Sequence, residues 1–320
     1  MKTAPTQSQT EKLTNDPVGI RRAVELLKSG AQVAFPTETV YGLGADACND
    51  TAIAGIYAAK GRPSFNPLIA HVADEAMARK LVDFTPGAGR LAAAFWPGAL
   101  TMVLPLNPDA GVSKLVTAGM DTLAVRVPDH PLAHPLLRDF GGPVAAPSAN
   151  PSGRISPTHS DHVMAGLDGK IAAVVLGGAC GVGVESTIIG FDPDPVLLRA
   201  GGLPVEAIEA CLGQPLRHIV NADMPTAPGQ LSSHYAPRGD VRLNADAAQS
   251  GEVLLGFGYV DATLNLSPTG DLIEAAANLF EMLHQLDAMG ADKIAISPIP
   301  NTGLGLAIND RLRRAAAPRP

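Results

Sequence analysis

Apolar and polar positions alternate along the first two thirds of the chain in patterns typical of helices and buried strands. Asp16 followed by Pro17 predicts a helix start, and helical spacing then continues to a stop at Gly30. The runs QVAFP and PLIAHV predict buried strands on either side of a helix, DTAIAGIYAAKG. Further strands are expected at LTMVLPL, TLAVRV, PVAAP, AAVVLGG, ESTIIGF and VLLRAG, and further helices near residues 74–82, 88–95, 130–139, 158–167 and 204–212. This alternation predicts a mixed α/β sheet covered by helices.

The pattern changes near Leu216, where a polar stretch punctuated by prolines begins. After it, GEVLLGFG, a helix over Leu272–Met289, KIAISPI and a helix at LGLAINDRLRRAA predict a compact β-α-β-α set. We therefore expect a large and a small domain. The expected divisions are a disordered tail at 1–15, a catalytic domain at 16–214, a linker at 215–238 that crosses the active site, and a small α/β domain at 239–320.

Composition narrows the class of protein. The chain has 320 residues, of which 46% are hydrophobic, and a net charge of -7, so a broadly basic nucleic-acid-coating surface is not expected. Cys48, Cys180 and Cys211 are odd in number and far apart, which favours a reducing cytoplasm over a disulfide framework or a zinc site. The opening segment lacks the apolar core of a signal peptide, and no apolar run is long enough to span a bilayer.

Several familiar motifs fail on inspection. The run LGGACGVGVEST follows an apolar strand, but Ser186 stands where a dinucleotide-binding fingerprint needs its third glycine, so a turn between two strands is expected. The chain has no Gly-x4-Gly-Lys-Ser/Thr phosphate loop. His130 and His134, and His159 and His162, are spaced to share helix faces, yet neither pair belongs to a metal motif. We expect them to cap helices or face solvent, and we assign no protein metal ligands.

Four segments share one pattern, an apolar strand next to cationic or polar groups. These groups are Lys60, Arg62, Asn66 and His71 in KGRPSFNPLIAH, Arg126 in TLAVRVP, Ser148, Asn150, Ser152, Arg154 and Ser156 in PVAAPSANPSGRIS, and Arg199 in VLLRAGG. Strand ends in α/β sheets commonly build one crevice, so the groups could converge. Such a site would hold a polyanion without a covalent nucleophile, which favours phosphoryl or nucleotidyl transfer. Each group taken singly fits a turn or surface role equally well, and Lys60 could simply complement a helix C-terminus.

The ordered motifs FPTETVYGLGADA, KGRPSFNPLIAHV, TLAVRVP, APSANPSGRISPT, GVESTIIG, LLRAGG and APGQLSSHYAP closely resemble the L-threonylcarbamoyladenylate synthases. More narrowly, they resemble the two-domain branch, which has a YrdC-like catalytic domain, a linker and a small C-terminal domain. The resemblance covers the chain from about Val18 to its end. It implies a YrdC-like mixed twisted sheet with helices around a concave site, followed by a small Rossmann-like α/β domain.

The resemblance also implies a reaction. L-threonine, bicarbonate or CO2, and ATP would give threonylcarbamoyl-AMP and pyrophosphate, with Mg²⁺ brought by ATP and with no organic cofactor. The product would feed N6-threonylcarbamoylation of the adenosine beside the tRNA anticodon, through a downstream tRNA threonylcarbamoyl-transferase machinery. The expected setting is cytoplasmic, without strong tRNA binding by this chain and without a membrane.

Site residues follow from the matched motifs. The resemblance implies that L-threonine and its carbamate are bound by Thr39, His71, Arg126, the backbone of Ala146, and Ser186. It implies that ATP is bound by Arg62, Asn66, Thr122, Ser148, Ser156, Arg199 and Tyr235. Lys60 and Arg62 are the expected catalytic residues, with Lys60 supporting the phosphates. Tyr235 would reach the nucleotide from a linker that acts as a lid. The alternative for Tyr235 is a plain linker anchor, with Pro237 stiffening the exit.

Near Thr39, Thr37, Glu38 and Tyr41 are expected to shape the loop, while Gly42 and Gly44 let the backbone turn closely.

Two segments depart from the family pattern, the linker and the ESTIIG strand. The linker has Ala227, Gln230 and Leu231 where the branch often has serine and then Met-Lys, so no linker lysine is expected to hold pyrophosphate. Gly190 replaces a common aspartate and receives no role.

Two other functions stay open on the sequence. A related enzyme class makes carbamoyl-AMP for hydrogenase maturation, but its longer chains carry zinc-finger segments, and this chain has no Cys-x-x-Cys pair. A non-catalytic RNA- or ribosome-binding module on the same fold is the other alternative, since a local basic groove is compatible with an acidic chain.

Overall fold

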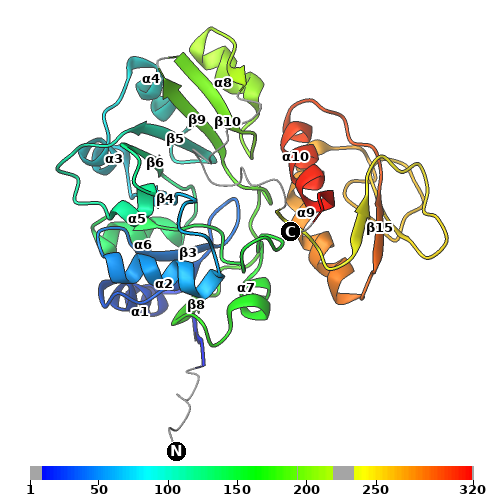
Figure 1. Cartoon of the computed structure of the whole chain (residues 1–320), viewed down its shortest axis with the longest axis horizontal. Helices are drawn as coiled ribbons and strands as arrows, with labels where there is room; N and C mark the ends of the chain where they lie inside the picture. The colour runs from blue at the N-terminus through cyan, green and yellow to red at the C-terminus, as the bar shows by residue number, and fades with distance from the viewer. Residues whose placement is uncertain (1–8, 193, 219–233, 319–320) are drawn as a thin grey trace, which may run out of the picture.

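The computed structural model describes residues 9–192, 194–218 and 234–318. Two domains are visible in Figure 1, a large N-terminal one and a small C-terminal one.

The sheet of the large domain has the strand order β1 (Glu11–Leu13), β8 (Ala173–Val175), β2 (Val33–Phe35), β3 (Gly42–Asp46), β7 (Val144–Ala145), β4 (Ile69–His71), β6 (Thr122–Arg126), β5 (Leu100–Pro105), β9 (Thr187–Asp192), β10 (Asp194–Arg199) and β11 (Arg217–His218). Parallel and antiparallel pairs both occur in it, which confirms the expected mixed sheet.

Helices cover this sheet as the hydrophobic spacing predicted, except that the short helix at Lys114–Thr117 was not expected. They are α1 (Pro17–Lys28), α2 (Asp50–Lys60), α3 (Glu75–Leu81), α4 (Pro86–Phe95), α5 (Lys114–Thr117), α6 (Ala133–Phe140), α7 (Ser160–Leu167) and α8 (Val205–Leu212). Asp16 caps α1, because its side chain accepts hydrogen bonds from the backbone N–H groups of Val18 and Gly19. Ala23 and Leu27 on the inner face of α1 are fully buried.

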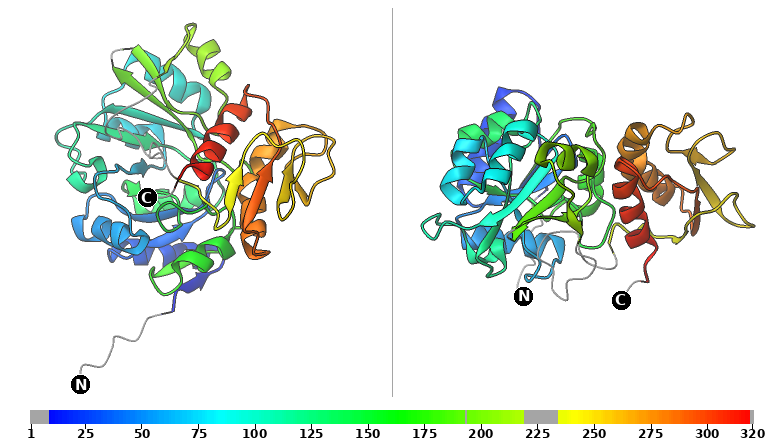
Figure 2. Two further views of the ribbon diagram at one scale, coloured as in Figure 1. Left: turned by 45° about the vertical axis from the view of Figure 1, so that its right-hand side comes forward. Right: turned by 90° about the horizontal axis from the view of Figure 1, so that it is seen from above.

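The small domain is a parallel four-stranded sheet in the order β12 (Asp240–Arg242), β15 (Lys293–Ile296), β13 (Val253–Gly256) and β14 (Leu264–Asn265). Its two helices are α9 (Leu272–Ala288) and α10 (Leu304–Ala316), which match the predicted helices closely. All strand pairs of this sheet are parallel, and the connection from β14 to β15 runs through α9, which agrees with the expected Rossmann-like arrangement. Figure 2 shows α10 on the side of the small domain that faces the large one.

The two domains share a hydrophobic core. Val184 of the large domain packs in one buried cluster with Leu279 and Phe280 of α9 and with Ile308 of α10. A side-chain carbon at Gly183 would fall 2.3 Å from the carbonyl oxygen of Ala276, so the two backbones approach too closely for any other residue. This contact places the small domain firmly beside the loop that precedes β9.

The structure differs from the sequence expectations at three places. Residues 11–13 form β1, which pairs in parallel with β8, although the segment 1–15 was expected to be a disordered tail. Gly42 and Gly44 lie within β3 rather than in a turn, and a side-chain carbon at Gly44 would fall 2.7 Å from the Phe35 ring. The segment 176–186 does join two strands, but β8 and β9 lie far apart in the sheet, so it is a crossover rather than a tight turn.

None of the helices in these described ranges is long and apolar enough to cross a membrane. Most of the proposed linker, including Ala227, Gln230 and Leu231, lies outside the described residues. Its expected role as a lid therefore stays a prediction.

Candidate active site

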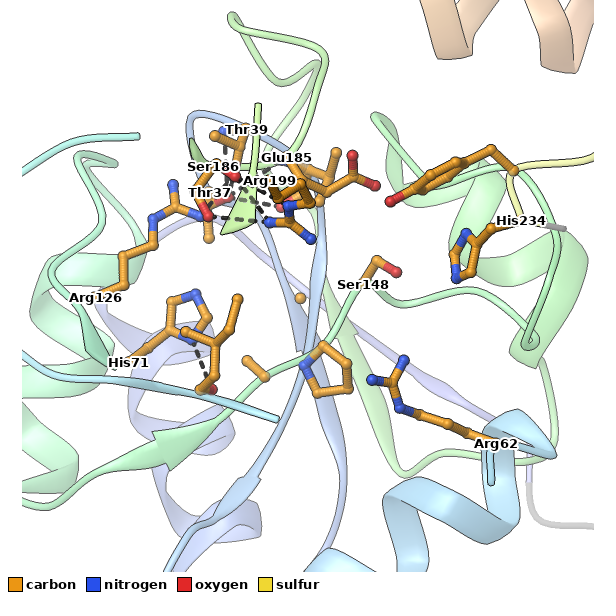
Figure 3. Close-up of a pocket in the computed structure, with 16 residues that line it drawn as sticks. Thr37, Thr39, Arg62, His71, Arg126, Ser148, Glu185, Ser186, Arg199 and His234 are labelled. Carbon is orange, nitrogen blue, oxygen red and sulfur yellow. Dashed lines mark hydrogen bonds between the residues drawn. The ribbon is translucent and has the colours of Figure 1, made fainter. Parts of the chain in front are cut away.

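A pocket lies where several strand ends of the large sheet meet (Figure 3). Its lining comprises Thr37, Thr39, Val40, Gly42, Arg62, Ile69, His71, Arg126, Ala146, Pro147, Ser148, Glu185, Ser186, Arg199, His234 and Tyr235. Nine of the sequence-predicted site residues are in this lining: Thr39, Arg62, His71, Arg126, Ala146, Ser148, Ser186, Arg199 and Tyr235. The scattered motifs therefore do converge, as the strand-end pattern predicted.

Sheet register explains why His71 and Arg126 lie together. Each is the last residue of its strand, and the two are directly paired in the parallel register of β4 and β6. Arg199 likewise ends β10, whose antiparallel partner β9 begins directly after Ser186. The amino-acid pattern of apolar strand followed by cation thus places three charged or ionisable groups at one crevice.

The loop between β2 and β3 fixes one wall of the pocket. Arg126 Nη1 donates a hydrogen bond to Thr39 Oγ1 at 2.9 Å, and its Nη2 forms an ion pair with Glu38 Oε1 at 2.6 Å. Thr37 Oγ1 lies 2.8 Å from Thr39 Oγ1 and donates to the Val40 carbonyl at 2.7 Å. Thr37 and Glu38 therefore hold the loop and the guanidinium in place, as expected, while Thr39 carries the hydroxyl that lines the pocket.

His71 and Ser186 extend the same side of the pocket. Burial, and then the charge of Arg126, lowers the pKa of His71 to about 3, so its ring is neutral at physiological pH. Ser186 Oγ lies 2.7 Å from Thr101 Oγ1 and accepts from Arg199 Nη2 at 3.2 Å. Thr101 is fully buried in β5, and the sequence reasoning missed it because it lies inside an apolar strand. This side of the site is rich in hydroxyls and holds two anchored arginines, Arg126 and Arg199.

The opposite side carries Arg62 and Ser148 in Figure 3. Gly61 ends α2 in the left-handed conformation with φ 59, and this turn directs Arg62 away from the helix axis. Arg62 Nη2 donates to the carbonyl of Pro67 at 3.0 Å, whereas its buried Nε has no partner among the described residues. Burial lowers the pKa of Arg62 to about 10, which still leaves it charged. An unsatisfied guanidinium N–H in a buried pocket indicates an anionic ligand.

Four predicted site residues lie outside the pocket lining. Lys60 Nζ donates to the carbonyls of Ser148 and Asn150, so it supports the loop that carries Ser148. Burial, and then the charge of Arg62, holds the pKa of Lys60 well below its usual value.

Asn66 is fully buried with both amide atoms unpartnered among the described residues, and Thr122 begins β6. Ser156 Oγ donates to Glu185 Oε1 at 2.5 Å. Direct ligand contact by these four stays a prediction.

Among the ionisable residues of the pocket lining, the sequence reasoning missed two, Glu185 and His234. Glu185 lies beside Ser186 in the GVEST motif, but its ion-pair partner, Arg311 in α10, is 126 positions away and gave no local signal. His234 is buried against the Tyr235 ring at 4.1 Å between centroids, and burial lowers its pKa to about 3.

Tyr235 both lines the pocket and anchors the chain to the small domain. Its ring stacks on Phe280 of α9 with centroids 5.5 Å apart. Its φ of 63 is unusual for an aromatic residue, so the surrounding contacts must hold it there. The anchor role inferred as an alternative for Tyr235 is therefore present together with its position in the pocket lining.

No group of three or more His, Cys, Asp or Glu side chains in the described part of the chain is arranged to hold a metal ion. His159 caps α7 by accepting from the backbone N–H of Asp161 at 3.4 Å, as expected. His130 accepts from the backbone N–H of Leu132 at 3.2 Å, just before α6. His162 instead stacks on His284 of α9, with ring centroids 3.8 Å apart.

Comparisons with known proteins agree with this geometry. A family model named for Sua5, YciO and YrdC, and described as "Telomere recombination", matches residues 25–201. A second model, described as "Threonylcarbamoyl-AMP synthase, C-terminal domain", matches residues 203–317. The chain is 44% identical to the threonylcarbamoyl-AMP synthase of Bacillus subtilis, over 96% of this chain and 95% of that protein.

Solved structures extend the likeness to three dimensions. The crystal structure of Pyrococcus abyssi Sua5 complexed with L-threonine matches with a TM-score of 0.88 at 38% identity, over 97% of this chain and 98% of that one. A variant of the same archaeal protein, with a histidine and a tyrosine changed to alanine, matches with a TM-score of 0.88 at 37% identity, over 96% of each chain. The chain belongs to the Sua5, YciO and YrdC family, in the branch that carries the Sua5 C-terminal domain.

Proposed function

We propose that this protein catalyses ATP-dependent formation of L-threonylcarbamoyladenylate from L-threonine, bicarbonate or CO2, and ATP, with release of pyrophosphate. The observation that carries the proposal is a single pocket in which a hydroxyl-rich wall with two anchored arginines faces a second, cationic wall. The relatives named above as threonylcarbamoyl-AMP synthases, and the related structure that holds L-threonine, support it.

The first wall suits an amino acid. Arg126 would neutralise the carboxylate or the carbamate of threonine. Before substrate arrives, the carboxylate of Glu38 balances the positive charge of Arg126. The hydroxyls of Thr39 and Ser186 would meet the polar groups of threonine, together with the backbone of Ala146 and the neutral His71 ring. A neutral imidazole adds no second positive charge, so selectivity here would come from hydrogen-bond geometry.

The second wall suits a nucleotide. Arg62 would hold phosphate oxygens with Ser148 on its side of the pocket, and Arg199 would hold them from its place beside Ser186. Tyr235 would reach in from the chain that joins the two domains. Asn66, Thr122 and Ser156 are proposed to contribute from just outside the pocket lining. Lys60, which carries the Ser148 loop, is proposed to support the phosphate site through that loop.

The reaction would bring two anions together. Threonine's amine would add CO2 to become a carbamate, and a carbamate oxygen would attack the α-phosphorus of ATP while pyrophosphate leaves. Each close pair of unit like charges costs roughly 1 to 4 kcal/mol at dielectrics between bulk water and a protein surface. The fixed guanidinium groups would offset this cost, so catalysis would rest on positioning and charge neutralisation rather than on a covalent nucleophile.

Mg²⁺ fits this site as a companion of ATP rather than as a protein-bound ion. Glu185, the carboxylate among the described lining residues, is already bound by Ser156 and Arg311. When bound, the ion would neutralise charge on the phosphates and so favour the departure of pyrophosphate. A metal carried in by phosphates and water needs few protein ligands, which agrees with a lining whose carboxylate, Glu185, already has two partners.

We place the product in the formation of N6-threonylcarbamoyladenosine beside the tRNA anticodon, through a separate downstream transferase. Cys48, Cys180 and Cys211 are all free thiols, which supports a reducing cytoplasmic setting. We retain 16–214, 215–238 and 239–320 as the proposed catalytic domain, linker and small domain, and add β1 to the first.

The experiment that tests the function is a substrate-omission assay. The protein is incubated with Mg-ATP, bicarbonate and L-threonine, and pyrophosphate is measured. Release should require L-threonine. Release without threonine would contradict the proposal, and a failure to bind any nucleotide would favour the RNA-binding alternative.

A further inference from the structure

A carboxylate is an unexpected group in a pocket that would receive a polyphosphate. Glu185 lines the pocket and is nevertheless almost fully buried. Its Oε1 accepts from Ser156 and its Oε2 accepts from Arg311 Nε at 2.9 Å. Because an uncompensated buried charge is strongly unfavourable, and because it would also repel phosphates, this carboxylate needs its partner.

The partner comes from the other domain. Arg311 lies in α10 with no exposed surface. Besides Glu185, its Nη1 donates to the carbonyl of Ala200 at 2.8 Å and pairs with Asp310 at 2.9 Å. Its guanidinium also lies over the Tyr235 ring, 5.3 Å from the centroid. One side chain of the small domain therefore contacts two lining residues of the pocket, Glu185 and Tyr235, and the backbone directly after Arg199.

Burial and the neighbouring arginines have opposite effects on the ionisation of Glu185. Burial alone would raise the pKa of Glu185, but the charges of Arg311 and then Arg199 bring it below its usual value. Arg199 Nη2 donates to the carbonyl and to the hydroxyl of Ser186, at the edge of the pocket. Without Arg311, Glu185 would be left to draw Arg199 toward itself, and the pocket would gain one negative charge.

We propose that Arg311 is a positioning residue of the active site, through which the small domain neutralises Glu185 and so lets the pocket accept nucleotide phosphates. The proposal rests on the function proposed above, because that function identifies the ligand as a nucleotide. It gives the small domain a defined part in nucleotide binding, although α10 does not itself line the pocket.

The test measures binding of a non-hydrolysable ATP analogue with Mg²⁺ by calorimetry, without threonine and without turnover. Arg311→Met should weaken analogue binding by about tenfold or more, because it leaves Glu185 charged and unpaired. The double variant E185Q/R311M removes both charges and should return the affinity to within about threefold of the wild type. Glu185→Gln alone should bind the analogue about threefold more tightly, because a repulsive charge is gone.

Arg313→Met is the matched control, because Arg313 is exposed on the same helix and loses the same charge. It should bind the analogue as the wild type does. The proposal is overturned if folded Arg311→Met binds normally, or if the double variant folds and binds as weakly as Arg311→Met. Weaker binding by Glu185→Gln would overturn it even where Arg311→Met does not fold. If the wild-type protein binds the analogue normally but shows no threonine-dependent turnover, that result would contradict the proposed function. It would not contradict the role proposed for Arg311.

Discussion

Arg126 Nη1 donates a 2.9 Å hydrogen bond to the hydroxyl of Thr39, joining the end of β6 to the loop between β2 and β3. Both residues are buried, and both line the pocket. The guanidinium and the hydroxyl thus reach the amino-acid side of the site already oriented, so less side-chain freedom is lost when substrate binds.

Thr39→Val tests the role of that hydroxyl. Valine keeps the shape but removes the hydrogen-bonding group, so we expect KM for L-threonine to rise about tenfold while affinity for an ATP analogue changes by less than about twofold. Steady-state kinetics with varied threonine gives the first quantity, and calorimetry gives the second. Thr39→Ser keeps the hydroxyl and should retain most activity. A normal KM for threonine in Thr39→Val would remove Thr39 from substrate contact.

Arg62→Ala should reduce kcat/KM for ATP by about 100-fold or more, because it removes a buried charge-assisted donor that we propose binds the phosphates. The fold should survive, because the visible contacts of Arg62 are to backbone carbonyls within its own loop. Circular dichroism checks the fold, and pyrophosphate release checks the rate. Arg90→Ala, an exposed position on α4, is the control. Near-normal turnover by Arg62→Ala would show that this guanidinium does not act on ATP.

Lys60→Met should lower stability as well as activity. The carbonyls of Ser148 and Asn150 would lose their donor inside the protein, which costs about 1–3 kcal/mol in the free energy of unfolding. Denaturant titration measures that loss. Lys80→Met, exposed on α3, should cost much less. If Lys60→Met were fully stable yet inactive, Lys60 would act on the phosphates directly rather than through the loop.

Stability should fall in mild acid. His71 and His234 each have a pKa lowered from 6.5 to about 3 by burial, so between these values the unfolded chain binds more protons than the folded one. The free energy of unfolding therefore decreases as pH falls below 6.5, by up to about 1.4 kcal/mol per pH unit for each histidine. His234→Asn should reduce this slope, and the exposed His134→Asn should leave it unchanged. An identical slope in His234→Asn would show that His234 is already protonated in the fold.

Local sequence signals were sufficient for the elements that carry the cations. The Asn49 cap and the glycine stop at Gly61 define α2, so the positions of Lys60 and Arg62 at its end follow from the sequence. Apolar runs that end in His71, Arg126 and Arg199 were correctly predicted as strands. Because strand ends often meet in one crevice, the amino-acid pattern made convergence of these residues possible, and the sheet register brings them together.

Other features depend on distant contacts and left no local signal. The strand β3 contains two glycines, which favour turns locally, yet close packing against Phe35 requires glycine at Gly44. The strand β1 buries Leu13, and its pairing with β8 comes from far along the chain. The pair of Glu185 and Arg311 joins two domains, so no spacing rule could link the two residues.

The most direct test of the proposed function follows the atoms into the product. The protein is supplied with Mg-ATP, isotopically labelled bicarbonate and L-threonine, and the adenylate is separated by chromatography and identified by mass spectrometry. We predict one labelled carbon and one threonine in each adenylate, formed in equal amount to the pyrophosphate released. An adenylate that lacks the labelled carbon or the threonine, or pyrophosphate released without such an adenylate, would contradict the account.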